Sequence, residues 1–168
     1  MSSVRSIFSL LLTTAFLLTG HGIHMTFLPL MASDIGLSQT VIGISGSAYF
    51  AGFISGAMVT PHIIARVGHV RSFTTLMAVF LCCFQVLPMT DAGWIWIVAR
   101  FLLGAVMCGA YTVVESWLSD QADPQNYGRV LGIYTLVVLG AMAAGQAILG
   151  LAYGDAAVVF ALISILIG

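Results

Sequence analysis

The sequence contains no lysine, and only 7% of its 168 residues are charged. Hydrophobic residues make up 60% of the chain, and its mean hydropathy is +1.09. A chain of this composition cannot enclose its apolar surface in one soluble core, so we expect lipid to be its solvent. The net charge is −1, whereas proteins that bind nucleic acid carry an excess of basic residues. This argues against nucleic acid as a partner.

Cysteine is also scarce, and all three cysteines fall within apolar stretches: Cys82, Cys83 and Cys108. The adjacent pair would point to different sides of a helix. We therefore interpret the cysteines as small packing residues, with no disulfide framework.

Six apolar stretches follow one another along the chain. Their approximate bounds are 7–30, 37–60, 73–90, 94–118, 130–152 and 156–168. The first five are near the ~20 residues that a helix needs to cross a bilayer. The sixth has 13 residues, short of the ~17 at the low end for a spanning helix, so either it is unusually short or it is truncated in a fragment. We favour a fragment, and the pattern predicts an all-α, polytopic membrane helix bundle.

Arginines outside the apolar stretches alternate along the chain. Arg5 precedes the first stretch, Arg66 and Arg71 lie between the second and third, and Arg129 lies between the fourth and fifth. The remaining connections carry only acidic residues, namely Asp34, Asp91 and Asp155. Because cytoplasmic loops of membrane proteins collect Lys and Arg, this alternation predicts a multi-pass protein with a cytoplasmic N-terminus.

Arg100 is the exception, because it lies inside the fourth stretch, six residues after Trp94. At ~1.5 Å per residue it would lie roughly 9 Å below the outer surface. One helix face would carry Arg100, Gly104, Cys108, Tyr111 and Glu115. A polar stripe of this kind faces the bundle interior or a water-filled cavity, whereas a snorkelling arginine is the simpler alternative.

Further polar residues are expected in the outer half of the bundle. His21 and His24 lie in the first stretch, Tyr49 in the second and Gln146 in the fifth. The histidines could bind substrate or protons, or serve as hydrogen-bonded structural residues. Tyr49 and Gln146 could likewise be only interhelical hydrogen-bonding groups. No third ligand accompanies the histidines, so we predict no metal site.

Glu115 is expected at the inner end of the fourth helix. There it could pair with Arg66 and Arg71, or with Arg129, and so form a cytoplasmic gate. The alternative is a solvated interfacial charge.

Small residues recur at four-residue spacing in two stretches. Ala48, Gly52 and Gly56 share one face of the second, and Ala141 with Gly145 one face of the fifth. Such faces let helices approach closely in lipid, as packing contacts or as surfaces that slide.

Gly43-Ile44-Ser45-Gly46 looks like the serine motif of rhomboid intramembrane proteases. A serine nucleophile needs a base, and in that family the histidine lies on a later helix. No histidine follows His69 here, so we disfavour a protease and expect no enzyme.

Several of these motifs resemble the major facilitator superfamily. In the segment 65–71, Arg66, Gly68 and Arg71 match its loop signature, although Ala65 replaces the acidic residue. Arg100-Phe101-Leu102-Leu103-Gly104 matches its Arg-x-x-x-Gly signature. A narrower likeness to YcaD-like bacterial inner-membrane transporters rests on Val114-Glu115-Ser116, Asn126-x-Gly128-Arg129, Tyr134 and Gly145-Gln146.

The resemblance implies the N-terminal six-helix half of a twelve-helix secondary transporter, built as a 3+3 inverted repeat and working by alternating access in the bacterial inner membrane. The first and fourth helices would line the cavity, and no cofactor is implied. Arg100 would favour an anionic small-molecule substrate or act as a counter-charge in proton coupling. The partner would be the missing C-terminal half or a second copy. The alternative is a non-transporting six-helix scaffold that dimerises.

The predicted site residues fall into two sets. The predicted substrate cavity is lined by His21, His24, Tyr49, Arg100, Tyr111 and Gln146. The predicted cytoplasmic gate consists of Arg66, Gly68, Arg71, Glu115 and Arg129.

Overall fold

The computed structural model describes residues 2–123, 125–152 and 154–168, with side chains from residue 6 onward. This part of the chain forms α1 (Ser2–Asp34), α2 (Gln39–Val67), α3 (His69–Val86), η1 (Leu87–Met89), α4 (Gly93–Gln121), α5 (Tyr127–Ala152) and α6 (Ala156–Ile167). The first five α-helices are long and apolar enough to cross a bilayer, and α6 is shorter. The all-α architecture predicted for a polytopic membrane protein is therefore confirmed.

Most helices extend beyond the apolar stretches that predicted them. The 29 residues of α2 span about 43 Å at ~1.5 Å per residue, against a hydrocarbon core of ~30 Å. Caps set the ends instead of hydropathy. Ser38 accepts a hydrogen bond from the Val41 amide at the start of α2, and Asp155 accepts two at the start of α6.

The third helix is shifted toward the N-terminus from its predicted bounds of 73–90. It begins at His69, directly after Gly68, and ends at Val86, where η1 takes over. Pro88 explains the early end, because it has no amide hydrogen to donate and its ring clashes with the preceding turn of an α-helix.

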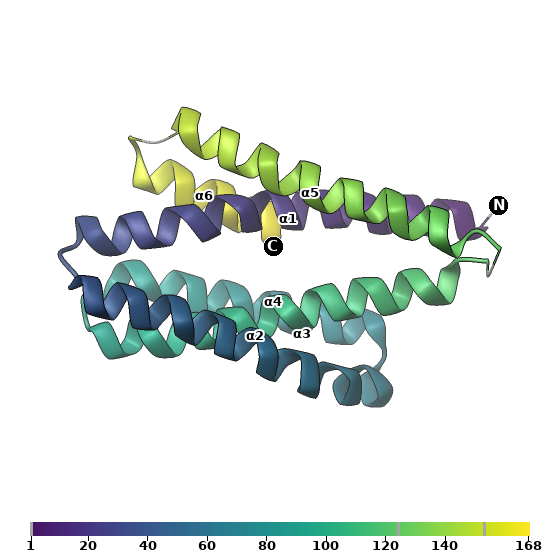
Figure 1. Ribbon diagram of the computed structural model, residues 1–168, viewed down its shortest axis with the longest axis horizontal. Coiled ribbons are helices and arrows are strands. Elements are labelled where there is room, and N and C mark those ends of the chain that lie inside the picture. Colours follow the sequence, from purple (N-terminus) through teal and green to yellow (C-terminus); the bar gives the residue numbers. More distant parts are fainter. Residues whose placement is uncertain (1, 124, 153) are drawn as a thin grey trace. The chain divides into compact units, whose positions relative to one another are not determined.

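The helices form two compact units. Unit 1 comprises Met1–Leu28 and Val114–Gly168, and unit 2 comprises Pro29–Val113. In unit 1, α1 packs with α5 and α6, and in unit 2, α2 and α3 pack with α4 (Figure 1). The division falls inside α1, at Pro29, and inside α4, so the last turns of each of these helices belong to the other unit.

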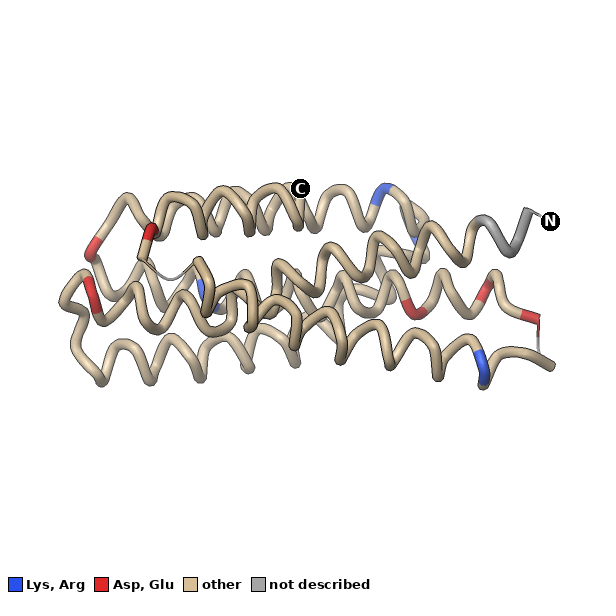
Figure 2. The backbone as a smooth tube through the Cα atoms, turned by 90° about the horizontal axis from the view of Figure 1, so that it is seen from above, with Lys and Arg blue, Asp and Glu red and all other residues tan. Residues whose placement is uncertain are grey.

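Apart from Arg100 and Glu115, which lie inside α4, charged residues gather near the helix ends (Figure 2). In unit 2, Arg66 and Arg71 flank the α2–α3 connection. Asp34 and Asp91 lie at the opposite end, where the start of α4 meets the start of α2. In unit 1, Arg129 lies at the start of α5 beside the α4–α5 connection, which carries Asp123, and Asp155 is the charged residue of the α5–α6 connection.

Two glycines bring α2 and α4 into backbone contact in unit 2. A Cβ atom at Gly52 of α2 would collide with the carbonyl oxygen of Phe101, three residues before Gly104 of α4. A Cβ atom at Gly104 would collide with the carbonyl oxygen of Tyr49, three residues before Gly52. This reciprocal contact is the α2–α4 crossing.

The α1–α5 crossing in unit 1 has the same register. A Cβ atom at Gly145 of α5 would collide with the carbonyl oxygen of Thr19, three residues before Gly22 of α1. A Cβ atom at Gly22 would collide with the carbonyl oxygen of Met142, three residues before Gly145. Helix α1 thus corresponds to α4 and α5 to α2, as a 3+3 repeat requires.

Candidate functional site

Tyr49 and Arg100 meet beside the α2–α4 crossing. The close approach of the two backbones puts the guanidinium carbon of Arg100 4.7 Å from the centroid of the Tyr49 ring, in cation–π geometry. Both side chains are buried, with 2% of Tyr49 and 4% of Arg100 exposed. The arginine is therefore held against an aromatic face within unit 2 and does not extend into solvent.

The guanidinium of Arg100 is not fully satisfied. Its Nη1 atom is buried and makes no hydrogen bond to any residue that the structure describes. A buried charged donor without an acceptor costs at least about 1–3 kcal/mol. The chain thus retains an unfavourable group that a bound anion would satisfy.

Two further aromatic side chains continue from Tyr49. The Phe53 ring centroid lies 6.4 Å from that of Tyr49 and 6.2 Å from that of Tyr111. We call Tyr49, Phe53 and Tyr111 the aromatic run. Phe53 was not among the predicted cavity residues, although its position one helical turn after Tyr49 was a usable signal.

The α1–α5 crossing shows which side chains a close helix crossing of this kind requires. The position of Arg100, four residues before Gly104, is taken by Leu18 before Gly22, and that of Tyr49 is taken by Met142 before Gly145. Leu18 is buried, with 1% exposed. The same backbone crossing therefore forms without a charge, so packing alone does not require Arg100.

The predicted cavity residues of α1 and α5 lie in unit 1. His21 and His24 are buried and stacked, with ring centroids 5.5 Å apart and an interplanar angle of 27°. The neighbouring Gly20 packs on α6 and Gly22 on α5. Gln146, by contrast, is exposed on α5.

The predicted gate residues are likewise divided between the units. In unit 1, the Tyr134 hydroxyl donates a hydrogen bond of 3.2 Å to Glu115 Oε1. No ion pair joins Arg129 to another residue in the described part of the chain. Arg129 lines a surface cavity of about 370 Å³ together with Ile7 and residues of the α4–α5 connection. Tyr134 was not predicted as the hydrogen-bonding partner of Glu115.

In unit 2, Arg66 and Arg71 are exposed on either side of Gly68. Gly68 has φ 82° and ψ 170° and is the single residue between α2 and α3. That backbone conformation is essentially restricted to glycine, which explains why this loop carries one.

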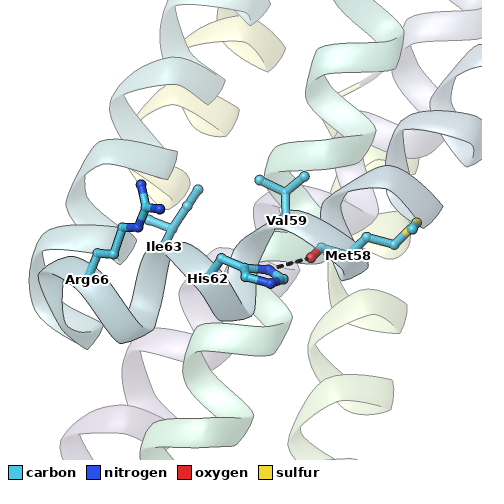
Figure 3. Close-up of a pocket in the computed structure, with 5 residues that line it drawn as sticks. All are labelled: Met58, Val59, His62, Ile63 and Arg66. Carbon is cyan, nitrogen blue, oxygen red and sulfur yellow. Dashed lines mark hydrogen bonds between the residues drawn. The ribbon is translucent and has the colours of Figure 1, made fainter.

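A second surface pocket, of about 420 Å³, follows one face of α2 and is lined by Met58, Val59, His62, Ile63 and Arg66 (Figure 3). His62 Nδ1 lies 3.0 Å from the carbonyl oxygen of Met58, one turn earlier. All five lining residues come from this helix, so the pocket is a groove on its exposed side. His62 was not among the predicted site residues.

The serine of the protease-like motif makes an ordinary helical contact. Ser45 is buried, and its hydroxyl donates a hydrogen bond of 2.8 Å to the carbonyl oxygen of Ile42. Serines inside helices commonly bond to the preceding turn in this way.

The fold defines a multi-pass membrane protein, and comparisons with known proteins identify its family. The Major Facilitator Superfamily model matches residues 10–168, so the chain belongs to the major facilitator superfamily. The six-helix arrangement is consistent with the N-terminal half of that fold. No solved structure matches the chain.

Among curated proteins, the chain is similar to an uncharacterized MFS-type transporter, YcaD, of Escherichia coli (strain K12). The two are 30% identical over 138 residues, which are 82% of this chain and 36% of that protein. The protein of the same description from Escherichia coli O139:H28 (strain E24377A / ETEC) is 31% identical over 129 residues, covering 76% of this chain and 34% of that protein. The chain spans about a third of the length of these relatives.

Proposed function

We propose that the chain is part of a secondary active transporter that moves a small solute by alternating access, and that Arg100 binds an anionic group of that solute. The observation that carries this proposal is the buried Arg100 guanidinium, which rests on Tyr49 and has no acceptor at Nη1. The α1–α5 crossing has the buried Leu18 at the position that corresponds to Arg100. Packing therefore does not require a charge here, which favours a functional role for Arg100. Ionisable groups inside membrane helices commonly serve substrate or proton pathways.

The proposed orientation places the N-terminus in the cytoplasm of a bacterial inner membrane. Its support is the distribution of arginine within each unit. One end of unit 2 carries Arg66 and Arg71, and the other carries acidic residues and no arginine. In unit 1, Arg129 lies at the end that also carries Asp120 and Asp123, and the α5–α6 connection carries Asp155 and no arginine. The end with arginine is the one expected on the cytoplasmic side.

A complete cavity is proposed to include the remaining predicted residues. His21, His24 and Gln146 would contribute from unit 1 and Tyr111 from unit 2. Because the chain spans about a third of its relatives, we propose that a C-terminal half or a second copy completes the site. Two such halves would alternate around a midplane site.

The test uses the complete gene product reconstituted in proteoliposomes. Solid-supported-membrane electrophysiology would compare a panel of small carboxylates with neutral and cationic solutes. We expect currents from at least one carboxylate and their loss in Arg100→Leu. Correctly inserted protein that transports only neutral or cationic solutes, unaffected by Arg100→Leu, would contradict the anion site. Complete inactivity would favour the non-transporting scaffold.

A further inference from the structure

The geometry points to an aromatic carboxylate as the ligand of the Arg100 site, an inference that rests on the proposed function. The carboxylate would pair with the guanidinium of Arg100, and the ring of the ligand would lie against the aromatic run. All the residues that carry this inference belong to unit 2.

The aromatic run extends along the same face of α4 that holds the arginine. Arg100 and Tyr111 are eleven residues apart on α4, which is about 16 Å along the helix axis and only about 20° around it. Phe53 of α2 bridges this interval, because its ring lies 6.4 Å from Tyr49 and 6.2 Å from Tyr111. A charged end and a π surface are therefore continuous in this unit.

The three rings of the run differ in exposure. Tyr49 is buried and supports the guanidinium, so its ring already has a partner. Phe53 and Tyr111 are only partly buried. A ligand ring would contact these two residues beyond Tyr49, while its carboxylate would pair with the arginine.

Each half of the ligand matches one part of the site. A carboxylate fits the planar donor edge of a guanidinium and would supply the acceptor that Nη1 lacks. Aromatic pairs in offset or edge-to-face geometry bind more tightly than their buried area alone predicts, by about two- to tenfold per pair. A saturated carboxylate would gain only the first of these interactions, and a neutral aromatic compound only the second.

The experiment measures ligand binding to the complete gene product in lipid nanodiscs by saturation-transfer difference NMR. Three probes separate the two interactions: benzoate, cyclohexanecarboxylate and benzyl alcohol. We expect benzoate to bind about two- to tenfold more tightly than cyclohexanecarboxylate. Benzyl alcohol should bind more weakly than both. Equal affinities of the two carboxylates would overturn the inference.

Variants then assign the preference to the site. Phe53→Leu should bring benzoate down to the affinity of cyclohexanecarboxylate, and Tyr111→Leu should reduce the preference if Phe53→Leu does not fold. The matched control is Phe16→Leu, which removes an aromatic ring that is 53% exposed on α1. An unchanged preference for benzoate in both site variants would overturn the inference.

Arg100→Leu separates this inference from the proposed function. If it abolishes binding of both carboxylates while the ring preference is absent from the wild type, the anion site stands and only the aromatic ligand is wrong. If it leaves both affinities unchanged, or if the wild type binds neither carboxylate, the anion site itself fails and the inference fails with it.

Discussion

Arg100 of α4 and Leu18 of α1 occupy the same register position, each four residues before the glycine of its helix crossing. Both are buried, at 4% and 1% exposed. One repeat therefore has a charged group where the other has an aliphatic one, although the backbone contacts of the two crossings correspond. The helix crossing therefore does not require the charge of Arg100, and another property of the protein must explain it.

Replacing Arg100 with leucine should consequently preserve the fold while abolishing transport. Leucine already fits this position in α1, and the substitution removes a buried donor whose burial costs at least about 1–3 kcal/mol. We expect an unfolding midpoint equal to or above that of the wild type, measured by far-UV circular dichroism in detergent. A misfolded variant would show that the arginine is structural, and a fully active one would refute the anion site.

Replacing Gly104 with alanine should destabilise the protein. The added methyl group would collide with the carbonyl oxygen of Tyr49, and overpacking of this kind typically costs about 1–3 kcal/mol. The matched control is Gly140→Ala in α5, where nothing lies within 4 Å and alanine should stabilise the helix by about 0.5–1 kcal/mol. Unfolding in an SDS titration would compare the two. Equal effects would mean that the α2–α4 contact is not as close as described.

The sequence alone could predict the number of helices and the faces that pack closely. Apolar stretches mark where a chain can cross lipid, and Gly52 and Gly145 stood out because their small-residue spacing matches one face of a helix. Helix ends were less predictable, because caps and Pro88 set them rather than hydropathy.

Side-chain partners from different helices could not be predicted. Tyr49 and Arg100 were both candidates, but their pairing depends on the register of α2 against α4, which two backbone contacts fix. For Glu115, the sequence left open an arginine partner or a solvated interfacial charge, and it gave no signal for a tyrosine partner. In the structure its carboxylate accepts from Tyr134, which hydropathy treats as an ordinary aromatic residue.

Replacing Gly68 should cost stability whichever residue takes its place. At φ 82° and ψ 170°, a side chain is strained by about 1–3 kcal/mol, even though nothing lies within 4 Å of the position. Asparagine tolerates left-handed helical angles but not this region, so Gly68→Asn should be as harmful as Gly68→Ala. Gly128→Ala is the control, because that position is also open and has no positive φ. A neutral Gly68→Ala would show that the connection between α2 and α3 adopts another conformation.

Cysteine labelling should establish the membrane orientation. In a background without Cys82, Cys83 and Cys108, we expect Ser33→Cys and Ala92→Cys to react with a membrane-impermeant thiol reagent in intact cells, since both connections lack basic residues. Ala122→Cys lies in the connection between α4 and α5, close to Arg129, and should react only after permeabilisation. Labelling of this third site in intact cells would overturn the proposed orientation.

Glu115 and Tyr134 should act together if their hydrogen bond helps to close the inner end of the protein. The 3.2 Å bond joins α4 to α5 near the arginine-bearing end of unit 1. A hydrogen bond contributes about 0.5–1.5 kcal/mol, which is enough to shift an equilibrium between two conformations that differ by a few kcal/mol. We expect Glu115→Leu, which removes the acceptor, and Tyr134→Phe, which removes the donor, each to raise the labelling rate of Ala122→Cys from the inner side. Because both remove the same bond, the double variant should label no faster than the faster single variant. Additive effects would show that the two residues act separately, and unchanged rates would leave Glu115 as an ordinary interfacial charge.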